Sequence, residues 1–311
     1  MQGVKSPALI MRNFIESEGL CCSQFDYLGD VWHLWTPDNY DLLFENAEAY
    51  KKGISIVGVC ARLFPRVKVI TFELMSNHIH FVLAGRERDI KAFFAYLKSL
   101  LSRAFDKKLG EWECQYRKIE NLKDARAVIV YNNRNGYIVS DCHSPFSYPW
   151  GANRFYFNPE AKARYRAVCR PVTFREKREL CRGHKADEVT GLMMVDDYAS
   201  PMSFCDIEAG ERLFRDGPHY FYELSRNVES QKSIAQEIGE RIFYTDDELF
   251  KVVFTRSKDK YGISRPSGLP KDAKMEMARH LHYEYNAGNK QIHRMLGLDL
   301  AVIDSLFPKA Q

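Results

Sequence analysis

Apolar and polar positions in the first half of the chain follow two different periods. The segment VWHLWTP (31–37) is rich in tryptophan and aliphatic residues and closes on a proline, which is typical of a strand. Further on, VKVITFELM (67–75) and FVLAG (81–85) flank the short segment SNHIH. Because Ser76 and Asn77 are turn formers, this pattern predicts two strands joined at a tight turn.

Helical spacing prevails between and after these strands. A helix is expected from Asp38, as its N-cap, to about Leu63, and a second one over DIKAFFAYLKSLLSRAF (89–105). A third is expected over DARAVIVYNNRN (124–135), with Gly136 after its last turn. Strand, helix, two strands and two helices within about 150 residues predict a small α+β sandwich.

The second half of the chain carries a different pattern. Residues 152–263 mix short helical patterns with basic patches such as RPVTFREKRELCRGHK (170–185). The segment 272–307 breaks into three helical pieces at Asn286-Ala287-Gly288 and at Gly297, which is the pattern of a helix-turn-helix and of any small helical hairpin. We therefore predict an α+β domain at 1–151, a mixed and mainly helical extension at 152–263 and a helix-turn-helix domain at 264–311.

Composition limits the class of protein. The chain is 45% hydrophobic and 28% charged, and no apolar run approaches the roughly 20 residues that span a membrane. Its eight cysteines are scattered without a CxxC pair, as expected of reduced thiols, and the N-terminus lacks the apolar stretch of a secretory signal. These features predict a cytoplasmic protein without a membrane partner. The net charge of +4 is compatible with a nucleic-acid partner without requiring one.

Two histidines one residue apart are the first candidates for chemistry. On a strand, residues i and i+2 point to the same face about 6.6 Å apart, so His78 and His80 can each give one imidazole nitrogen to a single divalent ion. Taken alone, an HxH pair is more often two packed histidines with local hydrogen bonds. Here the flanking residues predict a half-buried strand, where two imidazoles are costly without partners. Two such ligands leave coordination positions open for a substrate oxygen and water.

A third ligand and a nucleophile are expected on the helix that precedes Gly136. Tyr131 and Asn135 are spaced i, i+4 and share one helical face. The Asn135 amide offers a hard carbonyl oxygen, which suits Mg²⁺ or Mn²⁺ better than zinc. Tyr131 offers a phenol, a poor nucleophile at its free pKa of about 10 unless a metal-polarised phosphate lies beside it. The alternative for Tyr131 is an aromatic residue on the packed face of the helix.

These residues resemble those of the single-tyrosine HUH transposases, and in particular of the REP-associated tyrosine transposases. That family shows Asn/Glu-His-hydrophobic-His between two apolar strands, and this chain has LMSNHIHFVL. An amphipathic helix and a helix with Tyr-x-x-x-Asn follow in the family, and here Tyr131 and Asn135 match that motif, with Gly136 where a proline is usual. SPFSYPW (144–150) is similar to a further aromatic segment of the family, and the resemblance covers about residues 28–150.

The resemblance implies a ferredoxin-like, RRM-like HUH core in which helices flank an antiparallel sheet. It also implies that His78, His80 and Asn135 hold one Mg²⁺ or Mn²⁺ at the scissile phosphate of single-stranded or hairpin DNA. Tyr131 would then attack that phosphate to give a 5′-phosphotyrosine and a free 3′-OH, and reversal with another 3′-OH would rejoin strands. Members of the family work as monomers or as homodimers, and both states stay open for this chain.

DNA contacts are expected from basic and polar residues outside this cluster. Around the amphipathic helix the candidates for phosphate contacts are Lys91, Lys98, Arg103 and Lys107, although a solvated helix face is the default explanation for any one of them. In the last helices the candidates for phosphate or base-edge contacts are Lys290, Gln291, His293 and Arg294. His33 on the first strand either lines the active-site face or is a packed or exposed histidine.

Three functions are consistent with these residues. The first is a transposase-like single-stranded DNA endonuclease and strand transferase. The second is a domesticated sequence-specific DNA-binding or regulatory protein that keeps the HUH fold. The third is a metal-dependent hydrolase in which Tyr131 is only structural. The first is favoured over the second, because a silent copy has no reason to keep the two histidines, Tyr131 and Asn135 together.

Overall fold

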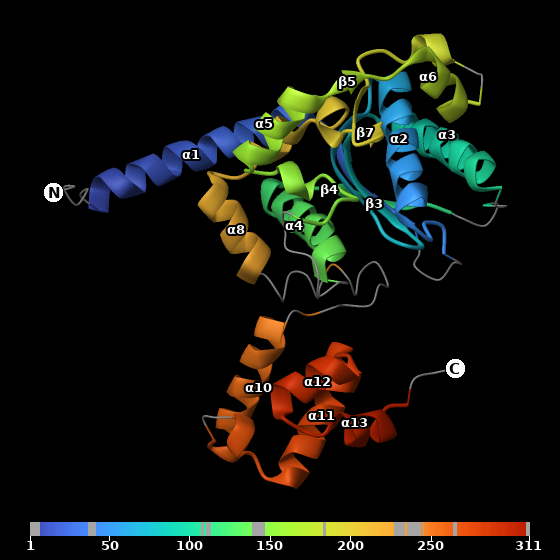
Figure 1. Ribbon diagram of the computed structural model, residues 1–311. Coiled ribbons are helices and arrows are strands. Elements are labelled where there is room, and N and C mark those ends of the chain that lie inside the picture. The colour runs from blue at the N-terminus through green and yellow to red at the C-terminus, as the bar shows by residue number, and fades with distance from the viewer. Residues whose placement is uncertain are drawn as a thin grey trace. The chain divides into compact units, whose positions relative to one another are not determined.

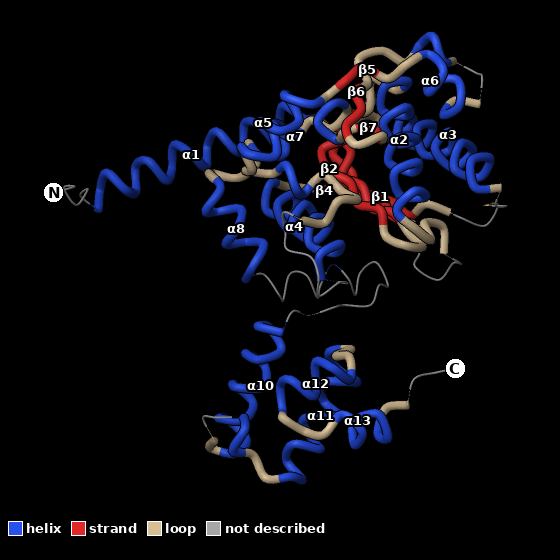
Figure 2. Tube along the Cα trace, in the orientation of Figure 1, coloured by secondary structure: helices blue, strands red, loops and turns tan. Residues whose placement is uncertain are grey.

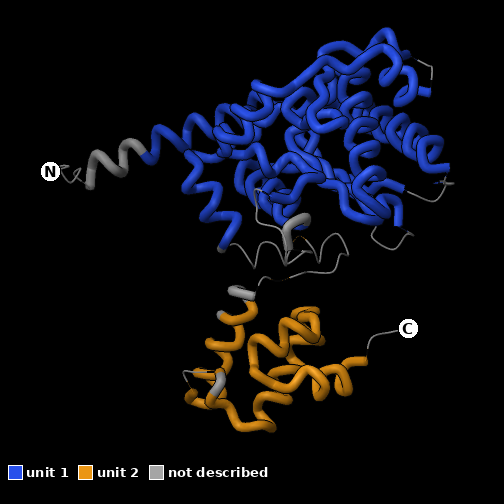
Figure 3. The backbone as a smooth tube through the Cα atoms, viewed as in Figure 1, with its two compact units in different colours: residues 1–227 blue, residues 228–311 orange. Residues whose placement is uncertain are grey.

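The computed structural model describes residues 7–36, 42–106, 109, 113–138, 147–182, 185–226, 234, 244, 246–263 and 266–308. The chain divides into two compact units, Met1–Asn227 and Val228–Gln311, which are coloured separately in Figure 3. Each unit has a buried apolar core. Among the helices described, none is both long and apolar enough to cross a membrane.

A four-stranded antiparallel sheet lies at the centre of the first unit (Figure 1). The strand order is β2-β3-β1-β4, and the strands are β1 (Val31–Trp35), β2 (Lys68–Leu74), β3 (Ile79–Ala84) and β4 (Gln115–Ile119). Helix α2 (Ala47–Leu63) connects β1 to β2, and α3 (Glu87–Phe105) connects β3 to β4, so that two β-α-β units interleave their strands (Figure 2). The predicted α+β class is confirmed.

One face of this sheet is apolar and carries α2 and α3. Leu34, Phe81 and Phe72 pair directly across β1, β3 and β2, so their side chains share this face. Phe81 packs edge-on against Phe93 of α3, with 5.9 Å between the ring centroids. Helix α2 begins at the N-cap Asn46 and packs against α3 and β2. Burial of these rings stabilises the layer by the hydrophobic effect.

The opposite face of the sheet is polar and is nevertheless buried. His33 of β1, Thr71 and Glu73 of β2 and His80 of β3 are each at most 1% exposed. Helix α4 (Leu122–Ile138) contacts β2 and β3 on this side. A polar sheet face that loses its water needs hydrogen-bond partners from the element that covers it, so the side chains of α4 determine whether this layer is stable.

A chain of buried hydrogen bonds fixes α4 on the polar face. The Thr71 hydroxyl donates to Asn133 Oδ1, and Asn133 Nδ2 donates to the hydroxyl of Tyr220 at 2.9 Å. Tyr220 belongs to α8 (Gly217–Arg226) and donates in turn to Asn153 Oδ1 at 2.5 Å. Side chains from a strand, two helices and the loop after α4 therefore satisfy one another in the core.

Residues after 150 complete the first unit. The Ala152 N–H donates to Phe72 O at 3.1 Å, and the Asp206 N–H donates to Val69 O at 2.8 Å, so later segments cover the edge strand β2. The predicted boundary at 151/152 thus falls inside one unit. The remaining elements of this unit are α1 (Pro7–Leu28), η1 (Asn153–Phe155), α5 (Pro159–Val168), β5 (Arg170–Pro171), α6 (Phe174–Leu180), η2 (Ala186–Glu188), β6 (Met193–Val195), β7 (Tyr198–Ala199), η3 (Pro201–Ser203) and α7 (Ile207–Glu211).

The second unit is helical. Its elements are α10 (Asp246–Tyr261), η4 (Pro266–Gly268), α11 (Lys271–Tyr285), α12 (Asn289–Leu296) and α13 (Leu300–Leu306). The two predicted helix breaks are confirmed, because Asn286 and Gly297 end α11 and α12 with left-handed φ angles of 48° and 60°. Leu249 and Val253 of α10 share one core with Leu281 of α11. The predicted boundary at 263/264 therefore separates helices that pack together.

Several predicted elements differ from the structure. Helix α2 starts at Ala47 and not at Asp38, which lies outside the described residues, as does Lys107. Helix α4 continues through Gly136 to Ile138, because glycine inside a helix costs only about 1 kcal/mol relative to alanine. The strand β4 and the long helix α1 were not predicted. The strand QYRKI is short and polar, so its residues give no strong period-2 pattern.

The buried hydrogen-bond chain gives a test of stability. Tyr220→Phe would leave the Asn133 amide and the Asn153 oxygen without a hydroxyl partner in the core, and we expect a loss of about 2 kcal/mol in unfolding free energy. Urea denaturation followed by tryptophan fluorescence measures it. The matched control is Tyr222→Phe on the same helix, where the side chain is 53% exposed and the expected change is near zero. Equal stability of the two variants would contradict the role of Tyr220.

Candidate active site: an imidazole and tyrosine cluster under helix α4

Three histidines and a tyrosine from separate segments meet on the polar face of the sheet. The rings of His78 and His80 have centroids 5.0 Å apart, and those of His33 and His80 stack at 5.8 Å. The Tyr131 ring lies edge-on to both His80 and His33, at 5.9 Å and 6.3 Å. The structure therefore brings together Tyr131 and the HxH pair, which are candidates from the sequence, and adds His33.

Strand pairing places His80 in this cluster. His80 is paired with Trp35 of β1 on one side and with Glu73 of β2 on the other, so the three side chains share one face of the sheet. The Trp35 ring in turn lies 4.8 Å from the ring of His33, measured between centroids. His80 is completely buried, whereas His78 precedes β3 in the turn and is partly exposed.

The turn before β3 holds His78 in a defined orientation. The Met75 N–H donates to the His78 carbonyl at 2.9 Å, and the Phe44 N–H donates to the carbonyl of Ser76 at 2.9 Å. His78 Nδ1 lies 2.8 Å from Asn77 Oδ1, an acceptor that can orient the ring through an Nδ1–H donor. Such a ring is oriented for metal binding through Nε2.

The two imidazoles of the HxH pair fit a shared divalent ion. A metal–nitrogen bond of about 2.1 Å puts each ring centroid about 3.2 Å from the ion, so ligand angles of about 90–110° give centroid separations of about 4.5–5.2 Å. The observed separation of His78 and His80 is 5.0 Å. Within the described parts of the chain, no three His, Cys, Asp or Glu side chains form a metal-binding group. A third protein ligand would have to be of another type, such as the amide of Asn135.

Helix α4 supplies the remaining predicted site residues. Tyr131 is 4% exposed and packs on the histidines, and Asn135 lies one turn later and is partly exposed. The Asn133 side chain is hydrogen-bonded to Thr71 and Tyr220, so its role is structural. Asn132 is completely buried between these residues, and its amide atoms have no hydrogen-bond partner among the residues that the structure describes.

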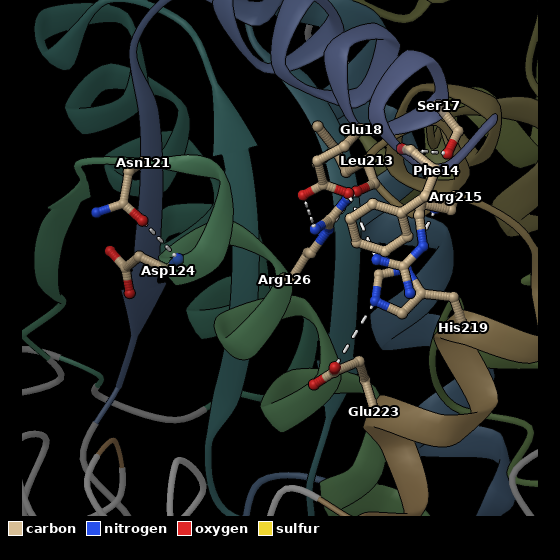
Figure 4. A network of polar contacts seen from close by, with 10 residues as sticks. All are labelled: Phe14, Ser17, Glu18, Asn121, Asp124, Arg126, Leu213, Arg215, His219 and Glu223. Carbon is tan, nitrogen blue, oxygen red and sulfur yellow. Dashed lines mark hydrogen bonds and ion pairs between the residues drawn. The ribbon is translucent and has the colours of Figure 1, made fainter. Parts of the chain in front are cut away.

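Polar contacts at the start of α4 hold the helix in place, as Figure 4 shows. The Asn121 side chain accepts the Asp124 N–H at 3.0 Å and caps the helix. The Arg126 guanidinium donates to both carboxylate oxygens of Glu18 on α1, at 2.6 and 3.1 Å, and to the Leu213 carbonyl at 2.6 Å. Its hydrogen bond holds the pKa of Glu18 below its usual value.

A histidine next to this ion pair responds to pH. His219 on α8 is 8% exposed, its Nδ1 accepts the Arg215 N–H at 3.2 Å, and its Nε2 lies 3.7 Å from Glu223 (Figure 4). Burial lowers the pKa of His219 below its usual value, and the charges of Arg215 and Arg126 lower it further. The neutral imidazole is therefore part of the packing between α8 and the loop before it.

Glu73 is a buried carboxylate of this face that sequence reasoning missed. The side chain is 1% exposed and belongs to the residue paired with His80. The sequence contains a signal that could have placed Glu73 beside His80. A hairpin that pairs Leu74 with Ile79 must also pair Glu73 with His80. Sequence reasoning also left His33 open between an active-site and a structural role, and its stacking on His80 resolves where it lies.

The predicted DNA contacts on α3 lie away from the cluster. Because α3 packs on the apolar face and α4 on the polar face, the sheet separates them. Lys91 is ion-paired with Glu87 at 2.7 Å, Lys98 is partly exposed, and exposed Arg103 donates to its own helix at Ser99 O. These residues therefore form a surface behind the sheet and not a path to Tyr131.

The candidates in the second unit divide into structural and exposed residues. Gln291 accepts the Gly288 N–H at 3.1 Å and donates to the Tyr244 carbonyl at 2.8 Å, so its amide supports the fold. His293 Nδ1 lies 2.7 Å from the Leu298 carbonyl. The side chains of Lys290 and Arg294 on α12 are exposed to solvent.

The lowered pKa of His219 gives a pH prediction. The unfolded chain binds the proton more readily, so the stability from neutral His219 is present above about pH 6.5 and is lost as pH falls through the lower folded value. We expect the urea midpoint of the first unit to fall between about pH 7 and about pH 5, and His219→Gln to reduce that fall. His293→Gln, at an exposed position of α12, is the control. Identical pH profiles for His219→Gln and the unmodified protein would contradict this assignment.

The cluster combines groups with complementary chemistry. Two imidazoles can bind a divalent ion, a phenol can act as a nucleophile, and a buried carboxylate lies in the same row of the sheet. All of these groups lie under one helix, whose position several polar contacts determine. The chain matches no family model, no curated protein sequence and no solved structure.

Proposed function

We propose that this protein is a metal-dependent single-stranded DNA endonuclease and strand transferase of the single-tyrosine HUH type, forming a 5′-phosphotyrosine. The observation that carries the proposal is the convergence of the HxH pair and Tyr131. The His78 and His80 centroids lie 5.0 Å apart, and the Tyr131 ring lies 5.9 Å from that of His80. A tyrosine on a packed helix face has no need for two imidazoles in HxH spacing beside it.

The strand topology supports the same proposal. Two interleaved β-α-β units in an antiparallel sheet are the ferredoxin-like arrangement that the resemblance implies. The placement of the HxH strand and the tyrosine helix brings the proposed ligands and the nucleophile to one face of the sheet. Here β3 lies between β2 and β1, and α4 packs on β2 and β3.

The metal of this proposal is Mg²⁺ or Mn²⁺, held by His78, His80 and the amide oxygen of Asn135. The two imidazoles have the separation that a shared ion needs, and the amide adds the oxygen ligand that these cations prefer. When bound there, the ion would act as a Lewis acid that polarises the phosphate.

The protein's own residues account for the transfer step. The Tyr131 oxygen forms a bond to phosphorus while the bond from phosphorus to the 3′ oxygen breaks, and the leaving oxygen takes up one proton as the phenol gives one up. His33 packs against both His80 and Tyr131 and keeps the two rings in register. The 5′-phosphotyrosine conserves the bond energy, so a second 3′-OH can reverse the step without an external energy source.

One observation favours a second candidate function. Tyr131 is 4% exposed and His80 is completely buried, so a phosphate reaches the phenol only if residues above the cluster move. A DNA-binding or regulatory protein that keeps the fold needs no such access. In that case the binding residues would be the exposed cations of α12, Lys290 and Arg294.

A covalent-trapping assay decides between these functions. The protein is mixed with labelled single-stranded hairpin oligonucleotides from the flanks of its own gene, with Mg²⁺ or Mn²⁺, and run on a denaturing gel. We expect a shifted, protease-sensitive band that Tyr131→Phe abolishes, at least 100-fold, because phenylalanine has no oxygen to attack with. Tyr116→Phe, a tyrosine on β4, is the control and should keep the band. If the protein binds the oligonucleotides but forms no covalent band with either metal, the nuclease proposal is wrong and the DNA-binding or regulatory function is favoured.

The metal ligands are tested separately from the nucleophile. His78 is only partly exposed and lies in a turn, so His78→Ala should fold, and we expect it to lose metal-dependent cleavage by at least tenfold. The second readout is the rise in thermal midpoint that Mn²⁺ produces in the unmodified protein, which should shrink in the variant because a ligand bound to the folded state stabilises it. Equal cleavage and an equal Mn²⁺ shift in both proteins would exclude His78 as a ligand.

A further inference from the structure

A groove of about 620 Å³ lies on the first unit between α2, α6 and the short strands β6 and β7. Both helices contribute charged side chains to its walls. Helix α6 packs against α2, so the groove lies in the layer on the apolar side of the sheet and is not part of the histidine cluster. Its volume is in the range of ligand-binding pockets.

Each acidic residue of the groove has an ion-pair partner. Glu48 is ion-paired with Lys51 at 2.8 Å, and Glu179 with Arg175 at 3.0 Å. Both Glu176 and Asp197 are ion-paired with Arg170, at 2.7 and 3.8 Å. The hydrogen bond from Arg170 also lowers the pKa of Glu176 to about 2, so this carboxylate stays charged and occupied. Glu176 and Asp197 share the single positive charge of Arg170, so these three residues together keep one negative charge.

Three cations of the groove have neutral partners only. Lys52 Nζ donates to the Ala104 carbonyl at 2.8 Å, and Arg182 donates to the Arg103 carbonyl at 2.6 Å. Arg178 lies over the ring of Phe174, 6.0 Å from its centroid. Across the described residues, none of these three cations has an ion pair. Their positive charges are therefore uncompensated.

Capping of a helix accounts for only part of this charge. The carbonyls that Lys52 and Arg182 contact belong to the last turn of α3, which carries the negative end of the helix dipole. That end amounts to roughly half an elementary charge, whereas two full positive charges face it. Arg182 also adopts a left-handed φ of 53°, an uncommon backbone conformation for arginine. Three unpaired cations against the one negative charge left on the Arg170 group give the groove a net charge of about +2, which suits an anionic ligand.

An exposed aromatic ring beside the groove indicates which anion. Phe174 is 55% exposed and lies one turn before Arg178 on α6. Nucleic-acid bases stack on exposed aromatic rings of this kind, and the phosphates that link the bases form ion pairs with neighbouring cations. A small anion such as phosphate would use the cations without the ring.

We propose that this groove binds the phosphate backbone of a nucleic-acid single strand through Lys52, Arg178 and Arg182, with a base stacked on Phe174. It shares its class of partner with the proposed function but none of its residues. A nucleic-acid strand bound in this groove lies on the opposite side of the sheet from Tyr131. The groove therefore contributes to binding affinity and takes no part in the transfer step.

Binding of a fluorescein-labelled 20-nucleotide oligothymidylate to the full chain, measured by anisotropy with EDTA present, tests the groove. The test variant is Lys52→Gln, Arg178→Gln and Arg182→Gln together, because glutamine keeps a donor for the carbonyls and removes the charge. We expect affinity to fall at least tenfold at about 0.1 M salt, and the slope of log affinity against log salt to become shallower by about 2, since each single-strand phosphate contributes about 0.7. The matched control is Glu48→Gln with Lys51→Gln, which removes a neutral pair from the same groove and should change neither quantity.

The outcomes separate this proposal from the proposed function. Unchanged affinity and salt slope in the triple variant would overturn the groove, and so would a loss confined to a 20-base-pair duplex. Phe174→Ala should weaken oligothymidylate and leave an abasic 20-mer unaffected, and equal effects on both would overturn the stacking contact. If the triple variant loses binding while the unmodified protein forms no phosphotyrosine, the groove stands and the proposed function falls.

Discussion

Burial of polar side chains on one face of the central sheet is the constraint on which the first unit depends. His33, Thr71, Glu73 and His80 occupy positions that apolar residues fill in most sheets, and each is at most 1% exposed. A buried polar group without a hydrogen bond costs about 1–3 kcal/mol, so four of them could cancel much of a domain's stability of about 5–15 kcal/mol. The covering helix therefore has to be polar where it meets the sheet, and α4 carries YNNRN at that point.

The same requirement couples the stability of the fold to the geometry of the cluster. Helix α4 is held by a cap at Asn121, by Arg126 on Glu18 and by Asn133 in the buried hydrogen-bond chain. Tyr131 lies between the last two of these contacts along the helix, so its position on the histidines follows from them. A change that loosens the contacts of Asn133 would move the phenol as well as destabilise the core.

Sequence periodicity predicted the elements that carry a clear apolar pattern of their own. It missed elements that form only because they pair with or pack on a segment far away in the sequence. The strands β1, β2 and β3 and the helix α3 carry strong apolar patterns, and the HxH spacing placed two imidazoles close together. The strand QYRKI has an exposed and charged edge, and it becomes a strand only because β1 offers it a pairing partner. The boundary predicted at 263/264 was drawn from nearby Pro and Gly residues, and Pro266–Gly268 form the short helix η4 between helices of one core.

Neither the charge nor the periodicity of a helix shows which face of the sheet it covers. The topology of the strands and their connections does show it. A β-α-β connection is almost always right-handed, and the two connections in β1-α2-β2 and β3-α3-β4 therefore put both helices on one face. The cations of α3 then have to lie behind the sheet from any chemistry under α4. Lys91, Lys98 and Arg103 were predicted to contact phosphates from their charge, and any such contact lies on the opposite side of the sheet from Tyr131. The same crossovers bring α2 beside α3, where Lys52 of α2 donates to the Ala104 carbonyl in the last turn of α3, and Arg182 after α6 donates to the Arg103 carbonyl of the same turn.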